Sequence, residues 1–148
     1  MAKMIDNKPS WKGEGKVWES LSANLPGDNV VYNQREVNGR EYDFCVMAEN
    51  LGLVIIEVKG WDPDKIDVRG VDNIIVDGYD EPQTSPKKQA RAYRFAILNK
   101  IVEKYNASPL VLDMVCYPFI TQEQYVRTKL DIVSEPEYTI FKEDIENG

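Results

Sequence analysis

The chain has 148 residues, enough for one domain that buries its own core without disulfides or a structural metal. Hydrophobic residues make up 43% and charged residues 29%, which excludes a disordered chain, and no apolar run approaches the ~18 residues of a membrane span. The net charge of −7 argues against tight nonspecific binding to nucleic acid. We therefore expect a soluble globular domain without membrane association.

Two residue types restrict the chemistry further. The chain has no histidine, which excludes Ser-His-Asp and Cys-His catalysis and histidine-ligated metal sites. Its two cysteines, Cys45 and Cys116, lie inside apolar runs and are interpreted as buried small hydrophobes in a reducing, cytoplasmic setting. Any bound metal must therefore be held by oxygen atoms, which favours Mg²⁺, Mn²⁺ or Ca²⁺.

The first half of the chain predicts a helix followed by three antiparallel strands. Residues 1–11 are expected to be a loose N-terminus, and the domain itself to span 12–141. Apolar residues recur every four positions from Trp11 to Leu25, as in a helix. Asn38-Gly39 is a strong hairpin signal between two strand-like runs. The expected strands cover 30–37, 41–48 and 53–59.

The side-chain alternation of the second and third strands assigns their faces. In the second strand, Tyr42 and Phe44 are expected on one side and Asp43 on the other. The third strand, from Leu53 to Lys59, is almost continuously apolar, as in a central strand that is buried on both faces.

The second half of the chain predicts an irregular acidic region and then a helix and a strand. Residues 61–86 contain seven acids and two bases, which is more typical of a solvated loop than of extra metal ligands, with a small hairpin around 70–72. Ser85 can cap the helix that follows, with Pro86 in its first position. The elements expected after this cap are a helix to about 105, a strand over 110–117, a short helix over 121–129, an edge strand over 138–141 and a polar tail or linker over 142–148.

The order α-β-β-β-α-β predicts an α/β fold in which helices flank a central mixed sheet. Within it, Glu57 and Lys59 are two positions apart near the end of the buried strand, so their side chains share a face. Asp43 lies one strand earlier, and antiparallel pairing can bring its carboxylate close to that of Glu57. Two converging carboxylates form a site for a hard cation, and a neighbouring lysine can orient a water or offset charge on a phosphate.

A simple ion pair between neighbouring strands would explain the same residues, because an acid-x-lysine triplet is a common pattern. The resemblance to a known family goes further. Gly13-Glu14, the segment 41–44 and the segment from Gly52 to Trp61 are similar to a NERD, or nuclease-related, domain of the PD-(D/E)XK superfamily, over about residues 12–105. This resemblance implies a restriction-endonuclease-like αβββαβ core.

The resemblance also implies roles for individual residues. A Mg²⁺ or Mn²⁺ ion would be held by Asp43, Glu57 and the backbone carbonyl of Val58, with Lys59 as the catalytic lysine. Glu14 matches the acid of the first helix in the family and is a further candidate ligand, with Glu19 as its rival in the same helix. The second-helix glutamine of the family corresponds to Gln89.

Other features suggest how a substrate would be bound. Lys87, Arg91 and Arg94 share one side of the second helix and are candidate contacts to a DNA backbone, although such a stripe is more often a solvated face. Trp61 can stack on a base, although a tryptophan at a strand exit is more often a packing residue.

The favoured function is therefore a metal-dependent nuclease that nicks or cleaves DNA. The family resemblance also implies that the domain is the N-terminal module of a larger DNA-processing protein such as a helicase. The alternative is a catalytically inactive module of the same fold that binds DNA or a protein partner.

Overall fold

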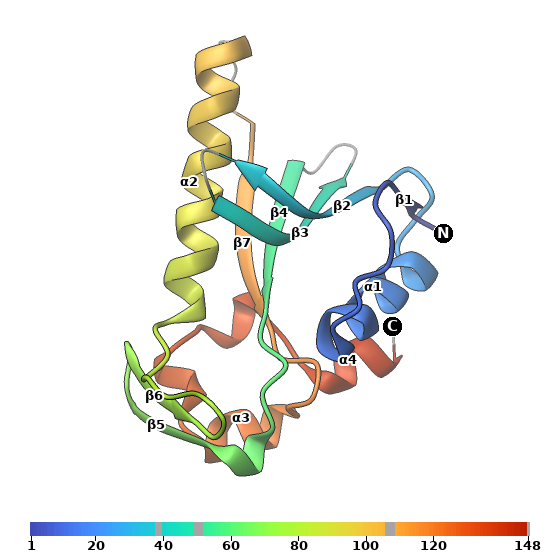
Figure 1. The fold of residues 1–148 in the computed structure, drawn as a ribbon. Helices are drawn as coiled ribbons and strands as arrows, with labels where there is room; N and C mark the ends of the chain where they lie inside the picture. Colours follow the sequence, from blue (N-terminus) through green and yellow to red (C-terminus); the bar gives the residue numbers. More distant parts are fainter. Residues whose placement is uncertain (38–39, 49–51, 106–108, 148) are drawn as a thin grey trace.

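The computed structural model describes residues 1–37, 40–48, 52–105 and 109–147, and its centre is a six-stranded mixed sheet (Figure 1). The strand order is β1-β2-β3-β4-β7-β8. Strand β3 pairs antiparallel with both β2 and β4. The other pairs are parallel: β1 with β2, β7 with β4, and β8 with β7. The expected α/β class and the α-β-β-β-α-β order are confirmed.

The elements of the αβββαβ core agree closely with the predicted ranges, because the sequence periodicity there matches the burial pattern. Their bounds are α1 (Lys12–Asn24), β2 (Val30–Val37), β3 (Arg40–Ala48), β4 (Gly52–Val58), α2 (Pro86–Tyr105) and β7 (Val111–Cys116). The hydroxyl of Ser85 accepts a hydrogen bond from the backbone N–H of Lys88, so the predicted N-cap of α2 is confirmed.

The sequence also predicted the positions of the smaller elements along the chain. The acidic region forms a separate two-stranded hairpin, and Thr121 caps the short helix that follows β7 through a capping box with Gln124. These elements are β5 (Ile66–Gly70), β6 (Asn73–Val76), α3 (Gln122–Arg127) and the edge strand β8 (Thr139–Ile140).

Helices cover the two faces of the sheet, so the core has three layers (Figure 1). On one face, Ile97 of α2 packs against Cys45 and Ile55. On the other face, Val17 of α1 packs against Phe44 and sheet neighbours, together with residues from the C-terminal end of the chain. The alternation of each strand therefore decides which helix a side chain meets.

A third apolar cluster anchors the segments that leave the sheet. Trp61, just after β4, packs with its ring centroid 6.1 Å from that of Tyr117, which follows β7. Tyr117 in turn lies near Tyr125 of α3. This cluster fixes the ends of β4 and β7, the two strands that leave the sheet side by side. Trp61 is 5% exposed, so packing rather than base stacking explains it.

The two chain ends are more ordered than the sequence predicts. Residues 1–11 were expected to be loose, but β1 (Lys3–Met4) pairs with β2, and Asp6 forms an ion pair with Arg35. The polar segment 142–148 was expected to be a tail or linker, yet α4 (Lys142–Asn147) packs beside α1 through the buried Ile145. Short-range patterns miss both contacts because their partners lie more than 25 residues away.

Some sequence predictions concern residues outside the described ranges, whereas others can be compared with the structure. The Asn38-Gly39 turn and the turn over 49–51 lie outside the described residues. Cys45 and Cys116 are both buried and free, as the sequence predicts. Within the described ranges, none of the helices combines the length and apolar character needed to cross a bilayer.

Candidate functional site

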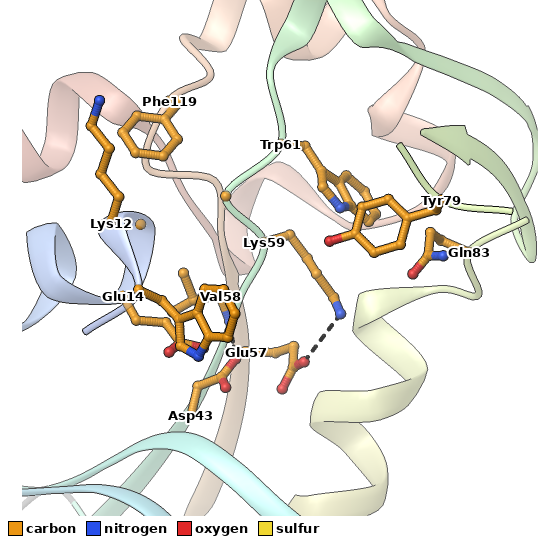
Figure 2. A pocket seen from close by; sticks show the side chains of 13 residues that line it. Lys12, Glu14, Asp43, Glu57, Val58, Lys59, Trp61, Tyr79, Gln83 and Phe119 are labelled. Atoms are coloured by element: carbon orange, nitrogen blue, oxygen red, sulfur yellow. Dashed lines mark hydrogen bonds and ion pairs between the residues drawn. The ribbon is translucent and has the colours of Figure 1, made fainter. Parts of the chain in front are cut away.

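A cleft of about 510 Å³ opens where β4 ends, between the start of α1 and the segment that joins β6 to α2 (Figure 2). Its floor contains the acidic and basic residues that the sequence singled out, and its rim contains aromatic side chains. The residues at its floor are Glu14, Asp43, Glu57, Val58 and Lys59.

Asp43 reaches the cleft because β3 separates from β4 at this point. The ladder between these strands ends at the pair Phe44 and Ile56, so Asp43 has no backbone partner on β4. Instead, its carboxylate Oδ2 accepts the backbone N–H of Val58 at 2.7 Å. The N–H and C=O of one strand residue point to the same side, so the Val58 carbonyl also faces the Asp43 side of the strand. The Asp43 carboxylate and the Val58 carbonyl therefore lie on the same side of β4.

An irregularity on the neighbouring strand accompanies this separation and corrects one prediction. Gln34, opposite Asp43 in register, has a φ of 54°, in the left-handed region that residues other than glycine rarely adopt. Tyr42 was predicted to share a face with Phe44, but it packs with Cys45 on the α2 side. Tyr42 therefore departs from the regular alternation of β3, on the part of the strand that pairs with the segment around Gln34.

Glu57 and Lys59 form the second part of the cleft floor. Glu57 is 6% exposed, and its Oε1 lies 3.5 Å from the Nζ of Lys59, as the dashed line in Figure 2 shows. Lys59 follows the last residue of β4 and is held by a hydrogen bond from its backbone N–H to the carbonyl of Cys116. This ion pair lies along β4 and not between neighbouring strands, the arrangement considered from the sequence, and it includes only one oxygen of Glu57.

Helix α1 brings Glu14 to the same cleft. Gly13 lies buried against the turn after β4, where a Cβ atom would come within 3.2 Å of the Cα of Gly60. The absence of a side chain at Gly13 thus lets the helix approach closely. Gln34 Nε2 donates a hydrogen bond of 3.0 Å to Glu14 Oε2. Glu19, the rival acid of this helix, pairs with Lys8 and does not line the cleft.

Burial, and after it the negative charge of neighbouring carboxylates, raises the pKa of all three carboxylates in the cleft. Burial, followed by the charge of Glu57, raises the pKa of Asp43 to about 6. Burial, followed by the charge of Asp43, raises the pKa of Glu14 to about 7. Burial also raises the pKa of Glu57, although Lys59 partly offsets that effect. Lys59, the lysine at the cleft floor, thus compensates less negative charge than the three carboxylates carry.

This donor set fits a hard divalent cation. Glu57 Oε2 is buried without a hydrogen-bond partner, next to the oxygen atoms of Asp43 and the Val58 backbone. In the described parts of the chain, no group of three or more aspartate, glutamate or cysteine side chains is placed to hold a metal ion. A cation here would therefore depend on the backbone carbonyl and on water in addition to carboxylates.

The candidate DNA-binding residues of α2 have a different environment from the one expected. Lys87 Nζ and Arg94 Nη1 each lie 2.8 Å from an oxygen of Asp113, which is 2% exposed on β7. These two cations thus have a buried structural partner, whereas Arg91 is exposed. Contact of this stripe with DNA stays a prediction.

Gln89 does not line the cleft, and its buried Oε1 has no hydrogen-bond partner in the structure as described. Gln83, from the segment between β6 and α2, lines the cleft instead (Figure 2). Sequence reasoning also missed the other rim residues, because nothing in their local pattern connects them to β4. These residues are Trp11, Lys12, Tyr79 and Phe119.

A comparison with models of protein families agrees with the family resemblance. A sequence model described as the nuclease-related domain, NERD, matches residues 9–118. A search of curated proteins found no match. Among solved structures, the crystal structure of a repair endonuclease from Pyrococcus abyssi is similar with a TM-score of 0.45 and 15% identity. The similarity covers 91% of this chain and 48% of that one, so this chain spans about half its length.

Proposed function

The chain belongs to the nuclease-related domain family, NERD, and from this premise we propose that it is a metal-dependent nuclease that hydrolyses DNA phosphodiester bonds by nicking or endonucleolytic cleavage. The observation that carries the proposal is the meeting of three carboxylates and one ammonium group in a single cleft. Glu14, Asp43, Glu57 and Lys59 come from three different elements and still line the same cavity.

The residues fit Mg²⁺ or Mn²⁺, with Asp43, Glu57 and the Val58 carbonyl as ligands and Glu14 acting through a water. Such an ion would withdraw negative charge from the phosphate and make a water more acidic. Two observations support this assignment: Glu57 Oε2 is buried without a hydrogen-bond partner, and the pKa values of Asp43 and Glu14 are raised. A bound cation would reduce the electrostatic repulsion among these carboxylates.

Lys59 has two tasks that its position allows. Its ammonium group donates hydrogen bonds, so it can orient the attacking water and can stabilise negative charge that develops on the phosphate. Glu57 restricts the motion of Lys59 through the 3.5 Å ion pair, and the side chain of Lys59 is 20% exposed, so it stays accessible to a substrate. Asp43 holds the backbone of Val58 through its hydrogen bond and thereby fixes the end of β4.

The test is cleavage of supercoiled plasmid with Mg²⁺ or Mn²⁺, with and without EDTA. We expect nicking that requires the metal and that falls by about 10²- to 10³-fold or more in Lys59→Ala. Lys100→Ala, which removes an exposed lysine of α2 outside the cleft, is the matched control and should keep full activity. Equal metal-dependent cleavage by Lys59→Ala and the wild-type protein would contradict the proposal.

A second candidate is a catalytically inactive module that binds DNA or a protein partner. The net charge of −7 favours an inactive module with a protein partner to a small degree, because an acidic surface repels the phosphates of DNA. DNA binding without cleavage in either metal would support this candidate. The further proposal of a covalently linked helicase or other DNA-processing domain rests on the family resemblance alone.

A further inference from the structure

Two exposed aromatic side chains line the cleft from segments that are far apart in the sequence. Trp11, at the start of α1, is 72% exposed, and Tyr79, between β6 and α2, is 57% exposed. Single exposed aromatic residues are common on protein surfaces. Two of them on one cleft, beside groups suited to phosphate chemistry, require an explanation. Neither is needed for the core, because the packing residue at this place is the buried Trp61.

The cleft continues past Trp11 into a neighbouring hollow of about 420 Å³ that Trp11, Lys12 and Phe119 also line. Figure 2 shows Lys12 and Phe119 on one side of the end of β4, and Tyr79 and Gln83 on the other side. The ammonium groups of Lys12 and Lys16 lie 5.9 and 5.3 Å from the centre of the Phe119 ring. Aromatic surface and positive charge are therefore combined along one path that crosses the site.

We propose that Trp11 and Tyr79 are stacking platforms for unpaired bases, and that the site therefore takes single-stranded DNA, or unpaired segments of DNA, in preference to duplex. The inference rests on the proposed function in taking DNA as the ligand. Bases inside a duplex stack on each other and do not present their faces, whereas the bases of a single strand can stack on aromatic side chains. Stacking thus distinguishes the two forms.

The charge of the site also favours stacking as the source of affinity. Three carboxylates in the cleft repel phosphates, and the whole chain is acidic. Most DNA-binding surfaces obtain their nonspecific affinity from many lysine and arginine contacts. Here, Lys12 lies on the cleft and, among the described ion pairs, has no acidic partner. A strand on this surface therefore gains little from charge and needs the aromatic contacts to bind.

Binding is measured separately from cleavage. Fluorescence anisotropy with a labelled 20-nucleotide oligothymidylate is compared with a blunt hairpin duplex of equal phosphate number, in EDTA and in Ca²⁺ at low salt. We expect the wild-type protein to bind the single strand at least about 10-fold more tightly. Trp11→Ala and Tyr79→Ala should each weaken single-strand binding by about 5- to 100-fold, the usual range for one stacked base.

The variants include controls for folding and for general hydrophobic loss. Trp11 makes no side-chain capping hydrogen bond, so its replacement removes no cap from α1. Trp11→Phe, which keeps an aromatic plane, should bind within about 3-fold of wild type, as one stacked base requires only a ring face. Phe95→Ala removes an aromatic residue that is 47% exposed on α2 and does not line the cleft, and it should bind like wild type.

The outcomes separate this inference from the proposed function. Equal binding of duplex and single strand, no effect of Trp11→Ala, or no single-strand binding in either buffer would overturn the inference, even if the protein nicks plasmid with metal. Preferential single-strand binding that depends on Trp11 and Tyr79, without any cleavage in Mg²⁺ or Mn²⁺, would support the inference and refute only the nuclease activity.

Discussion

Acidic side chains at two places in the molecule have opposite electrostatic balance. On β7, Asp113 is paired with both Lys87 and Arg94. Burial by itself would raise the pKa of Asp113, but the hydrogen bonds from these two cations outweigh it and hold the pKa below its ordinary value. At the floor of the cleft, three carboxylates lie near one lysine, Lys59, and their pKa values are raised.

This difference separates a structural carboxylate from the carboxylates of the proposed site. Asp113 has enough positive charge around it to stay ionised without any ligand. Asp43 and its neighbours have too little positive charge around them, so they lower the stability of the fold unless they bind a proton or a cation. The same residue type can therefore stabilise the protein at one place and destabilise it at another. Four predictions test this contrast.

The largest expected effect is on activity. Asp43→Asn keeps a hydrogen-bond acceptor for the Val58 N–H but removes a charge, and we expect plasmid nicking to fall by about 10²-fold or more because an electrostatic contribution to the site is lost. Asp113→Asn should keep nicking within about 3-fold at temperatures well below its melting point. If the two variants lose activity equally, the division between the two groups is wrong.

The next effect is on stability at Asp113. Asp113→Asn leaves Lys87 and Arg94 facing a neutral group in a buried position, which should lower the free energy of unfolding by about 3 kcal/mol. For a chain of this length, Tm should fall by about 6–12 °C. Asp67→Asn, at an exposed ion pair with Arg69, is the control and should change stability by less than about 0.5 kcal/mol.

At Asp43 the same substitution should have the opposite sign. At pH 8 without metal, Asp43→Asn should raise the free energy of unfolding by about 2 kcal/mol, because it removes a charge that burial and Glu57 disfavour. Thermal or urea unfolding in EDTA measures this change. The gain should shrink at pH 5, where Asp43 in the folded protein is largely protonated. A loss of stability at pH 8 would show that the charge of Asp43 is already compensated.

The smallest expected effect is the pH dependence of the wild-type protein in EDTA. The pKa values of Asp43 and Glu14, about 6 and 7, exceed those of the unfolded chain, so the folded state binds more protons in this range. Stability should therefore fall as pH rises, by about 1–2 kcal/mol between pH 5 and 8. Asp113 acts in the other direction, because its lowered pKa contributes stability that is lost in acid, below about pH 4.

Unfolding curves across this pH range would test both directions at once. Mn²⁺ should flatten the decline above pH 6 if it takes the place of the missing positive charge. A wild-type profile that rises steadily from pH 5 to pH 8 in EDTA would refute the assigned imbalance of charge in the cleft.

The sequence predicted most of the fold because its signals are local. The apolar periodicity over α1, the alternation along the strands and the Ser85-Pro86 cap each depend on a few neighbouring residues. The spacing of Glu57 and Lys59 also fixed their common face. Predictions failed where a distant segment decides the outcome, as for the ordered N-terminus, the C-terminal helix and the side on which Tyr42 packs.

For the candidate site too, the sequence identified some features and the structure was needed for others. Sequence selected Asp43, Glu57 and Lys59, and the family resemblance selected Glu14, with Glu19 as its rival because both belong to one helix. The close approach at Gly13 and the hydrogen bond from Gln34 favour Glu14. Lys87 and Arg94 do share one side of α2, but only the packing of α2 on β7 reveals Asp113 between them.

By itself, the sequence determined which residue types can act, since a chain without histidine must use carboxylates, lysine and oxygen ligands. It also determined the element order, because helix and strand periods are properties of short segments. Only the tertiary structure decided which charges are compensated and which aromatic residues reach the cleft. The reason is that burial and charge pairing depend on distances between segments far apart in the chain, and local patterns contain no information about those distances.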